Sequence, residues 1–440
     1  MNAVFRRRNL LYQAVASGSL AMAELTVSLL CAKALGPDGL GQIAAAISLA
    51  TVTFALVDLR LQEATVVMSA SLLHGNARDE LAPVLRRLLY LDILSGVLGF
   101  GMVCTLAAAP AILTRSLATS GPLLFTAGAA ILLKNVGNAV CRAYLRVRER
   151  YAMLAALTAA GAVARVAVLV SIATSAAAAE ASDVLLLVLI GNATAGALLV
   201  LPTVALAIFR DGMTARSTSI GRETATHLSR FVRGSWLQSL SLVPLREMDI
   251  VILAATAGDT AVGIYRLARV GIQTTDALLS PIHLVIFPHI AQLLARGATQ
   301  ALARFLRKLT IYLGLFGGLI AAVGALIAPI VVEATAGASF RSAVPLLQTI
   351  LVTAPLVAIT LWTGPLLVAA RATHRAAITT AIAGLLSLIV TGVVATSAGP
   401  WGPVAGFVTF TAVHAAASLY AGSRDTTLRA VLAATVRPGN

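Results

Sequence analysis

Long apolar runs separated by short polar connections fill this 440-residue chain from end to end. A helix needs about 20 apolar residues to cross about 30 Å of hydrocarbon, and about twelve runs are long enough. They cover residues 10–34, 41–73, 88–110, 122–141, 151–176, 184–209, 236–255, 262–293, 309–332, 343–370, 376–397 and 402–421. The pattern predicts an all-α transmembrane protein with about twelve spans.

Basic residues occupy alternate connections between these runs. If the N-terminus is cytoplasmic, the cytoplasmic connections carry most of the 33 Lys and Arg residues, in clusters that begin at Arg6, Arg78, Arg142, Arg210, Arg296, Arg371 and Arg424. Cationic loops stay on the cytoplasmic side because their translocation is costly. Both termini are therefore expected in the cytoplasm.

The composition excludes an ordinary soluble protein. Hydrophobic residues make up 58% of the chain and charged residues only 12%, and the mean hydropathy is +0.90. The net charge of +15 lies mostly in short juxtamembrane loops, where anionic lipids and not nucleic acid are the expected partner.

Motifs for catalysis, metal binding and nucleotide binding are absent from the sequence. Cys31, Cys104 and Cys141 form no CxxC pair, and the six histidines lack HExxH spacing. There is no Walker A motif. We expect neither an enzyme nor a resident metal or cofactor.

The largest cytoplasmic connection divides the predicted spans six and six. The expected domains are an N-terminal six-helix bundle at 1–215, a basic linker at 216–234 and a C-terminal six-helix bundle at 235–440. Within the connection, residues 223–233 predict a short interfacial helix whose Leu228, Phe231 and Val232 face lipid.

A faint repeat relates the two halves. Gly36-Pro37-Asp38-Gly39-Leu40-Gly41 joins the first two spans, and Gly258-Asp259-Thr260-Ala261-Val262-Gly263 joins the seventh and eighth. The same offset places Glu24 opposite Arg246. Duplicated halves are common in secondary transporters, whose substrate sites lie at the repeat interface.

Several short motifs, in order, resemble those of a known family. Residues 34–41 match an "LGPxxxG" turn, and Asp249, Tyr265 and Ala268 match "D…G…vGxYxxA". Further matches are Phe287-Pro288, Gly337 with Phe340 and Ala343, residues 367–371 and residues 399–406. By these motifs the chain resembles the polysaccharide flippases of the MOP superfamily. One departure is Arg60, where the family pattern has a glycine.

The resemblance implies two six-helix bundles that form a V around a central cavity, with alternating access. It implies translocation of undecaprenyl-pyrophosphate-linked oligosaccharide across the bacterial inner (plasma) membrane, for lipopolysaccharide or exopolysaccharide biosynthesis. A polysaccharide polymerase and glycosyltransferases are the protein partners that such a role suggests.

Charged residues within the spans are the candidate site. A charge at the bilayer centre costs about 2.5–3.5 kcal/mol on insertion scales, so such residues tend to face a cavity or a partner. Arginine and lysine can replace the hydration of a pyrophosphate, and Glu24 or Asp249 could couple transport to H⁺ or Na⁺. The candidate cations are Arg60, Lys134, Arg165, Arg246, Arg266 and Arg269.

Each candidate also has a structural interpretation. Arg60 could snorkel or pair with Asp58 and Glu63, and Glu24 could pair with a cation such as Arg246. Arg266 and Arg269 could contact outer-leaflet phosphates. Asp92 is expected at the membrane interface. The polar stripe of Lys134, Asn138 and Arg142 could line a cavity, and its Arg142 end is expected to lie in a loop.

The sequence is also compatible with two other functions. A cation-coupled multidrug exporter of the same superfamily would have an acidic cavity. A non-transporting scaffold for glycosyltransferases would depend on the basic loops and not on the charges within the spans.

Overall fold

The computed structural model describes residues 3–74, 80–108, 121–174, 180–211, 220–242, 247–369 and 373–424. These residues form helices joined by turns and contain no strand. The all-α fold class is confirmed.

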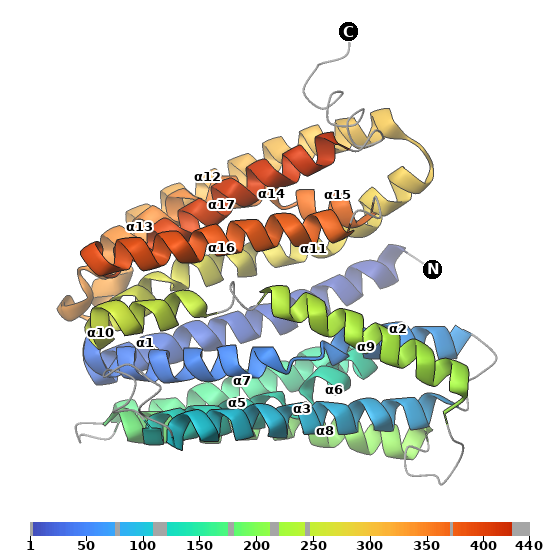
Figure 1. The fold of residues 1–440 in the computed structure, drawn as a ribbon, viewed down its shortest axis with the longest axis horizontal. Coiled ribbons are helices and arrows are strands. Elements are labelled where there is room, and N and C mark those ends of the chain that lie inside the picture. The colour runs from blue at the N-terminus through green and yellow to red at the C-terminus, as the bar shows by residue number, and fades with distance from the viewer. Residues whose placement is uncertain are drawn as a thin grey trace. The chain divides into compact units, whose positions relative to one another are not determined.

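The chain divides into two compact units, and the turn within the first helix is the only part of that helix in the second unit. One unit comprises Met1–Leu35 and Gln42–Glu247, and the other comprises Gly36–Gly41 and Met248–Asn440. The helices of the first unit, drawn in blue to green in Figure 1, are α1 (Ala3–Leu56), α2 (Leu61–His74), α3 (Leu81–Ala108), α5 (Gly121–Asn135), α6 (Asn138–Val147), α7 (Tyr151–Thr174), α8 (Ala181–Asp211) and α9 (Arg222–Leu242).

The second unit holds the remaining helices. They are α10 (Met248–Ala268), α11 (Val270–Ala295), α12 (Thr299–Ala336), α13 (Ala343–Val352), α14 (Ala354–Thr360), α15 (Thr363–Ala369), α16 (Thr373–Ala398) and α17 (Trp401–Ser423), with a short 3₁₀ turn at Ala338–Phe340. The domain boundaries expected from the sequence stay a prediction.

Ten stretches of the described chain are long and apolar enough to cross a membrane. Two of them, Leu11–Leu56 and Met248–Leu279, contain a helix break at Gly36 (φ 68°) and Gly258 (φ 80°). The chain reverses direction within α1 (Figure 1). Each of these two stretches therefore covers parts of two predicted spans, and the protein is a multi-pass membrane protein.

The two glycine-rich turns pack against each other inside the second unit. A Cβ on Gly41 would overlap the carbonyl oxygen of Asp259, and a Cβ on Gly263 would overlap that of Pro37. The side chain of Thr260 also hydrogen-bonds to Asp38. The contact explains why residues 36–41 group with the second unit and why the repeat keeps a glycine at its last position.

Within the connection between the halves, Arg222–Leu242 form one amphipathic helix, which is longer than the predicted 223–233. Leu228 is 2% exposed and packs among apolar residues of α2, α3, α6, α7 and α8, with Phe231 and Val232 packed against the same cluster. The prediction that these three residues face lipid is wrong, because the unit's own helices cover them. The exposed face of α9 carries Arg222, Arg230 and Arg233 instead.

The residues predicted to begin the seventh span lie on α9. Trp236, the expected first residue of that span, belongs to α9, where its Nε1 donates to the Leu56 carbonyl oxygen at 2.9 Å. Ser239 of α9 donates to Asp58 Oδ2 at 3.2 Å. These bonds hold the end of α9 against other residues of the first unit, and the next described helix begins at Met248.

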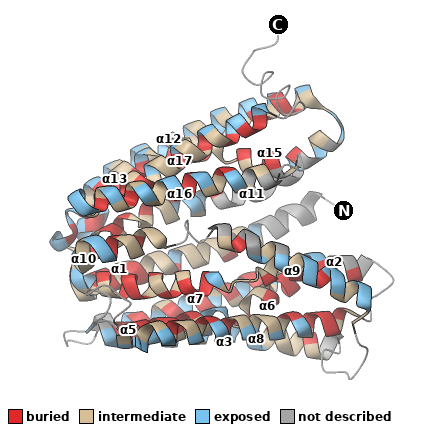
Figure 2. Ribbon diagram, viewed as in Figure 1, coloured by how far each residue is buried: buried red, intermediate tan, exposed pale blue. Residues whose placement is uncertain are grey.

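Large apolar side chains remain exposed along the long helices. On α12, whose outer face is largely pale blue and tan in Figure 2, they include Ile311, Leu315, Leu319, Leu326 and Ile330. A contiguous exposed apolar stripe on a helix of 38 residues is the surface that contacts hydrocarbon.

Candidate functional site

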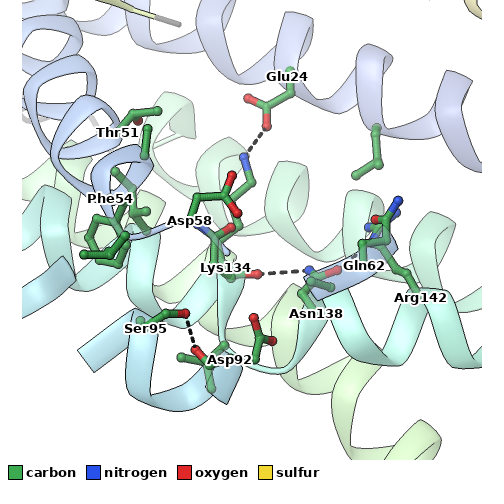
Figure 3. A pocket seen from close by; sticks show the side chains of 18 residues that line it. Glu24, Thr51, Phe54, Asp58, Gln62, Asp92, Ser95, Lys134, Asn138 and Arg142 are labelled. Atoms are coloured by element: carbon green, nitrogen blue, oxygen red, sulfur yellow. Dashed lines mark hydrogen bonds and ion pairs between the residues drawn. The ribbon is translucent and has the colours of Figure 1, made fainter. Parts of the chain in front are cut away.

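The first unit contains a cavity of about 480 Å³, which we name the main cavity. Figure 3 shows side chains from several helices pointing into it. The polar residues of its lining are Glu24, Thr51, Asp58, Gln62, Asp92, Ser95, Lys134, Asn135, Asn138 and Arg142. Five of these ten are ionisable, which is unusual inside a unit of apolar helices.

A three-residue charge cluster lies at one part of this lining. Lys134 Nζ and Arg165 NH1 each donate to Glu24 Oε1 at 3.0 Å. Figure 3 shows the lysine amine pointing at the carboxylate. The structure thus brings together three predicted site residues from α1, α5 and α7, and Arg165 has the partner from another helix that its position suggested.

The polar stripe of Lys134, Asn138 and Arg142 crosses the break between α5 and α6. Gly137, with φ 72°, interrupts the helix between Asn135 and Asn138, yet the stripe remains connected. Asn138 Nδ2 donates to the Lys134 carbonyl oxygen at 2.9 Å, and Arg142 Nε donates to Asn138 Oδ1 at 2.5 Å. Arg142 lines the main cavity, so the prediction that it lies in a loop is wrong.

The local ion cluster proposed for Arg60 is present. Arg60 NH2 donates to Glu63 Oε1 at 2.5 Å, and the Arg60 backbone N–H donates to Asp58 Oδ1 at 2.9 Å. Its φ is 50°, in the left-handed region that glycine tolerates best. This explains why the family pattern has a glycine there. Arg60 lines a second cavity of about 270 Å³ that shares Asp58 and Asp92 with the main cavity.

Asp92 is a candidate site residue that the sequence analysis did not single out. It was expected at the membrane interface, but it lines both cavities of the first unit. Its Oδ2 is buried and accepts no hydrogen bond within the described part of the chain. Its position one helical turn before Gly96, in a run otherwise apolar, was the signal that could have indicated a cavity.

A small pocket of about 40 Å³ adjoins the charge cluster, and its lining includes Arg165, Thr158 and Asn192. Thr158 Oγ1 and Asn192 Oδ1 are buried there without a hydrogen-bond partner in the described chain. A pocket of this volume with unsatisfied polar atoms suits a bound water molecule.

The second unit has a separate charge cluster. Asp249 Oδ2 accepts a hydrogen bond from Tyr265 at 2.6 Å, and its Oδ1 accepts from Arg269 NH1 at 3.2 Å and from the Ile250 N–H at 2.9 Å. The acidic and aromatic residues of the "D…G…vGxYxxA" motif therefore contact each other directly.

The remaining predicted residues are dispersed. Arg266 is half-buried in the last turn of α10, and Arg246 lies outside the described residues. Glu247, the last residue of the first unit, accepts a 2.7 Å hydrogen bond from Ser48 of the same unit. No group of His, Cys, Asp and Glu side chains suited to a metal ion occurs in the described ranges.

Comparison with known proteins agrees with this architecture. The family described as "Polysaccharide biosynthesis protein" matches residues 30–345. No curated protein matches the chain.

Solved structures share the fold at low sequence identity. An inward-facing multidrug resistance MATE family transporter of the MOP superfamily superposes with a TM-score of 0.75 at 16% identity, over 94% of this chain and 99% of that one. The lipid II flippase MurJ, in an inward closed conformation, superposes with a TM-score of 0.69 at 12% identity, over 97% and 90% of the two chains. The chain therefore belongs to the polysaccharide biosynthesis protein family, and its fold is that of MOP-superfamily transporters.

Proposed function

We propose that this protein is a flippase that carries polyprenyl-pyrophosphate-linked oligosaccharide from the cytoplasmic to the outer leaflet of the bacterial inner membrane. Alternating access exposes the main cavity first to one side and then to the other. Family membership supports a glycan substrate, and the named lipid II flippase with the same fold supports the lipid-linked form.

The main cavity carries the proposal, because its lining suits both parts of such a headgroup. Lys134 and Arg142 line it, and Arg165 stands behind Lys134. These cations can replace the hydration that a pyrophosphate loses in the membrane. The volume of about 480 Å³ lies within the range of ligand pockets.

Neutral polar side chains in the main cavity suit the sugars of the headgroup. Thr51, Gln62, Ser95, Asn135 and Asn138 line the same cavity. Amides and hydroxyls both donate and accept hydrogen bonds, as sugar hydroxyls do. A lipophilic drug would leave many of these groups unpaired, which is costly in a buried site. The polyprenyl tail stays in the surrounding lipid.

An H⁺ or Na⁺ gradient drives the cycle. Anionic lipids bind the basic cytoplasmic face, where Arg222, Arg230 and Arg233 are exposed on α9. A polymerase and glycosyltransferases act on the same glycan before and after the flipping step.

A leaflet assay tests the function. Cells are depleted of the protein, their lipid-linked glycan is labelled, and an external glycosidase reports the outer-leaflet fraction. We expect glycan to accumulate on the inner leaflet and surface polysaccharide to fall. An unchanged leaflet distribution, in a strain without a second flippase gene, would overturn the proposal.

A cation-coupled multidrug exporter is the second candidate, and Asp58 and Asp92 favour it because both line the main cavity. The two candidates differ in substrate charge. Export of lipophilic cations that stops in an Asp92→Asn variant, with glycan distribution unchanged, would select the exporter.

A further inference from the structure

The carboxylate of Glu24 is shared by two cations that differ in burial. Both nitrogens lie 3.0 Å from the same oxygen, Oε1, but the Arg165 side chain is 7% exposed and the Lys134 side chain is 46% exposed. The two ion pairs therefore differ in how easily they separate.

Arg165 is the fixed partner. Its guanidinium is nearly inaccessible to solvent, and removing it from Glu24 would leave a buried charge without a counterion. Lys134 is the exchangeable partner, because a half-exposed ammonium on a flexible stem separates from a carboxylate at little cost.

The cavity offers Lys134 a second place to bind. Its side chain lines the main cavity, and Arg142 lines the same cavity two turns further along the polar stripe. Among the described residues no carboxylate pairs with Arg142; its Nε donates to the neutral amide of Asn138. An anion bound at Arg142 would attract the Lys134 ammonium away from Glu24.

We propose that Glu24 is an internal counter-anion that competes with the substrate headgroup for Lys134. In the empty cavity Glu24 holds both Lys134 and Arg165. When a diphosphate binds at Arg142, Lys134 transfers to it and Glu24 keeps Arg165. Recapture of Lys134 by Glu24 then helps the headgroup to leave.

This inference rests on the proposed function, since it takes the headgroup to be a diphosphate. It replaces the ion-coupling role that the sequence suggested for Glu24. An oxygen that already accepts from two cations is a poor site for a third, and the same contacts make the residue a suitable competitor for an anion.

A binding experiment on the purified full-length protein in lipid nanodiscs tests the competition. The probe is farnesyl diphosphate, and farnesol is the neutral control with the same tail. Glu24→Gln removes the competing charge, so we expect its Kd for farnesyl diphosphate to fall about fivefold. Lys134→Gln should raise the Kd, and Glu24→Gln should have little effect in the Lys134→Gln background.

The matched control is Glu333→Gln, which removes a carboxylate that is also paired with a cation but lies outside the main cavity. Glu333 Oε1 accepts from Arg341 NH2 at 2.9 Å, and both side chains are exposed. Glu333→Gln should leave the Kd unchanged. Equal or weaker binding by Glu24→Gln, or the same gain with and without Lys134, would overturn the proposal.

A second measurement uses the wild-type protein and does not depend on the stability of a variant. A carbodiimide should join Lys134 Nζ and the Glu24 carboxyl as an amide, detected by mass spectrometry of the linked peptides. Farnesyl diphosphate should reduce the yield of this link, and farnesol should not. An unchanged yield at saturating diphosphate would also overturn the proposal.

The outcomes separate the two proposals. If wild-type protein flips glycan in cells but Glu24 and Lys134 show no coupling, only the counter-anion role fails. If diphosphate exchanges Lys134 but the leaflet distribution does not depend on the protein, only the flippase function fails. A wild-type protein that binds no diphosphate overturns the counter-anion role directly.

Discussion

Gly263 lies directly against the carbonyl oxygen of Pro37, leaving no room for a side chain. Gly263→Ala should therefore destabilise the protein by about 1–3 kcal/mol, the usual cost of overpacking, because the obstacle is backbone and cannot rotate away. Gly318→Ala on α12 is the control, since open space surrounds that position. Thermal unfolding in detergent measures both. Equal melting temperatures for the two variants would contradict the close contact.

The two cations on Glu24 should contribute unequally to stability. Arg165→Gln removes a buried partner and should cost about 3 kcal/mol. Lys134→Gln removes a half-exposed partner and should cost about 1 kcal/mol or less. The exposed fractions of 7% and 46% are the basis of this order. Chemical unfolding of both variants gives the comparison, and a larger loss for Lys134→Gln would show that the assigned burial is wrong.

Tyr265 is fully buried, and its hydroxyl donates to Asp249. Tyr265→Phe should lower stability by about 1–2 kcal/mol, because the carboxylate loses a donor while the ring keeps its packing. A double-mutant cycle with Asp249→Asn isolates the hydrogen bond. If the two substitutions are additive, the bond contributes nothing to stability.

Glycine usually makes a protein less stable than alanine does, but the left-handed backbone of Arg60 predicts the opposite order at this position. Arg60→Gly should be about 1 kcal/mol more stable than Arg60→Ala, because only glycine adopts a φ of 50° without steric cost. Both variants lose the pair with Glu63 equally, so their difference measures the backbone term. Thermal unfolding checks it, and an alanine variant at least as stable as the glycine variant would argue against the left-handed conformation.

Arg142 should be needed for glycan flipping and dispensable for folding. Arg142→Gln should reduce the outer-leaflet glycan signal about tenfold, equivalent to about 1.4 kcal/mol of lost interaction with the headgroup. Arg341→Gln changes an exposed arginine that pairs with Glu333, and it should flip glycan normally. Immunoblots must show equal amounts of both variants in the membrane. Normal flipping by Arg142→Gln would remove this residue from the mechanism.

Local rules predicted some site geometry correctly. The pairing of Arg60 with Glu63 follows from their spacing of three residues. Lys134 and Asn138 follow from a spacing of four, although Gly137 interrupts the helix between them. Such contacts depend on sequence separation alone, so the chain reveals them without a fold.

Contacts between different helices could not be predicted from sequence separation. Glu24 and Arg165 are separated by 141 residues, and no periodicity relates them. Leu228 gave the amphipathic signal of a lipid-facing helix, but a protein core and a lipid surface exclude water equally well. Which of the two covers Leu228 depended on where α2 and α3 lie.

The sequence by itself determined the helical class, the order of the spans and the turns that divide them. Those features follow from the length of apolar runs and from glycine conformations, which are local properties of the chain. Only the tertiary structure decided which intramembrane charges meet. A buried charge requires a partner or a polar cavity, but the requirement does not say which of many candidates will satisfy it. The structure places Lys134 of α5 and Arg165 of α7 within 3.0 Å of the Glu24 carboxylate of α1.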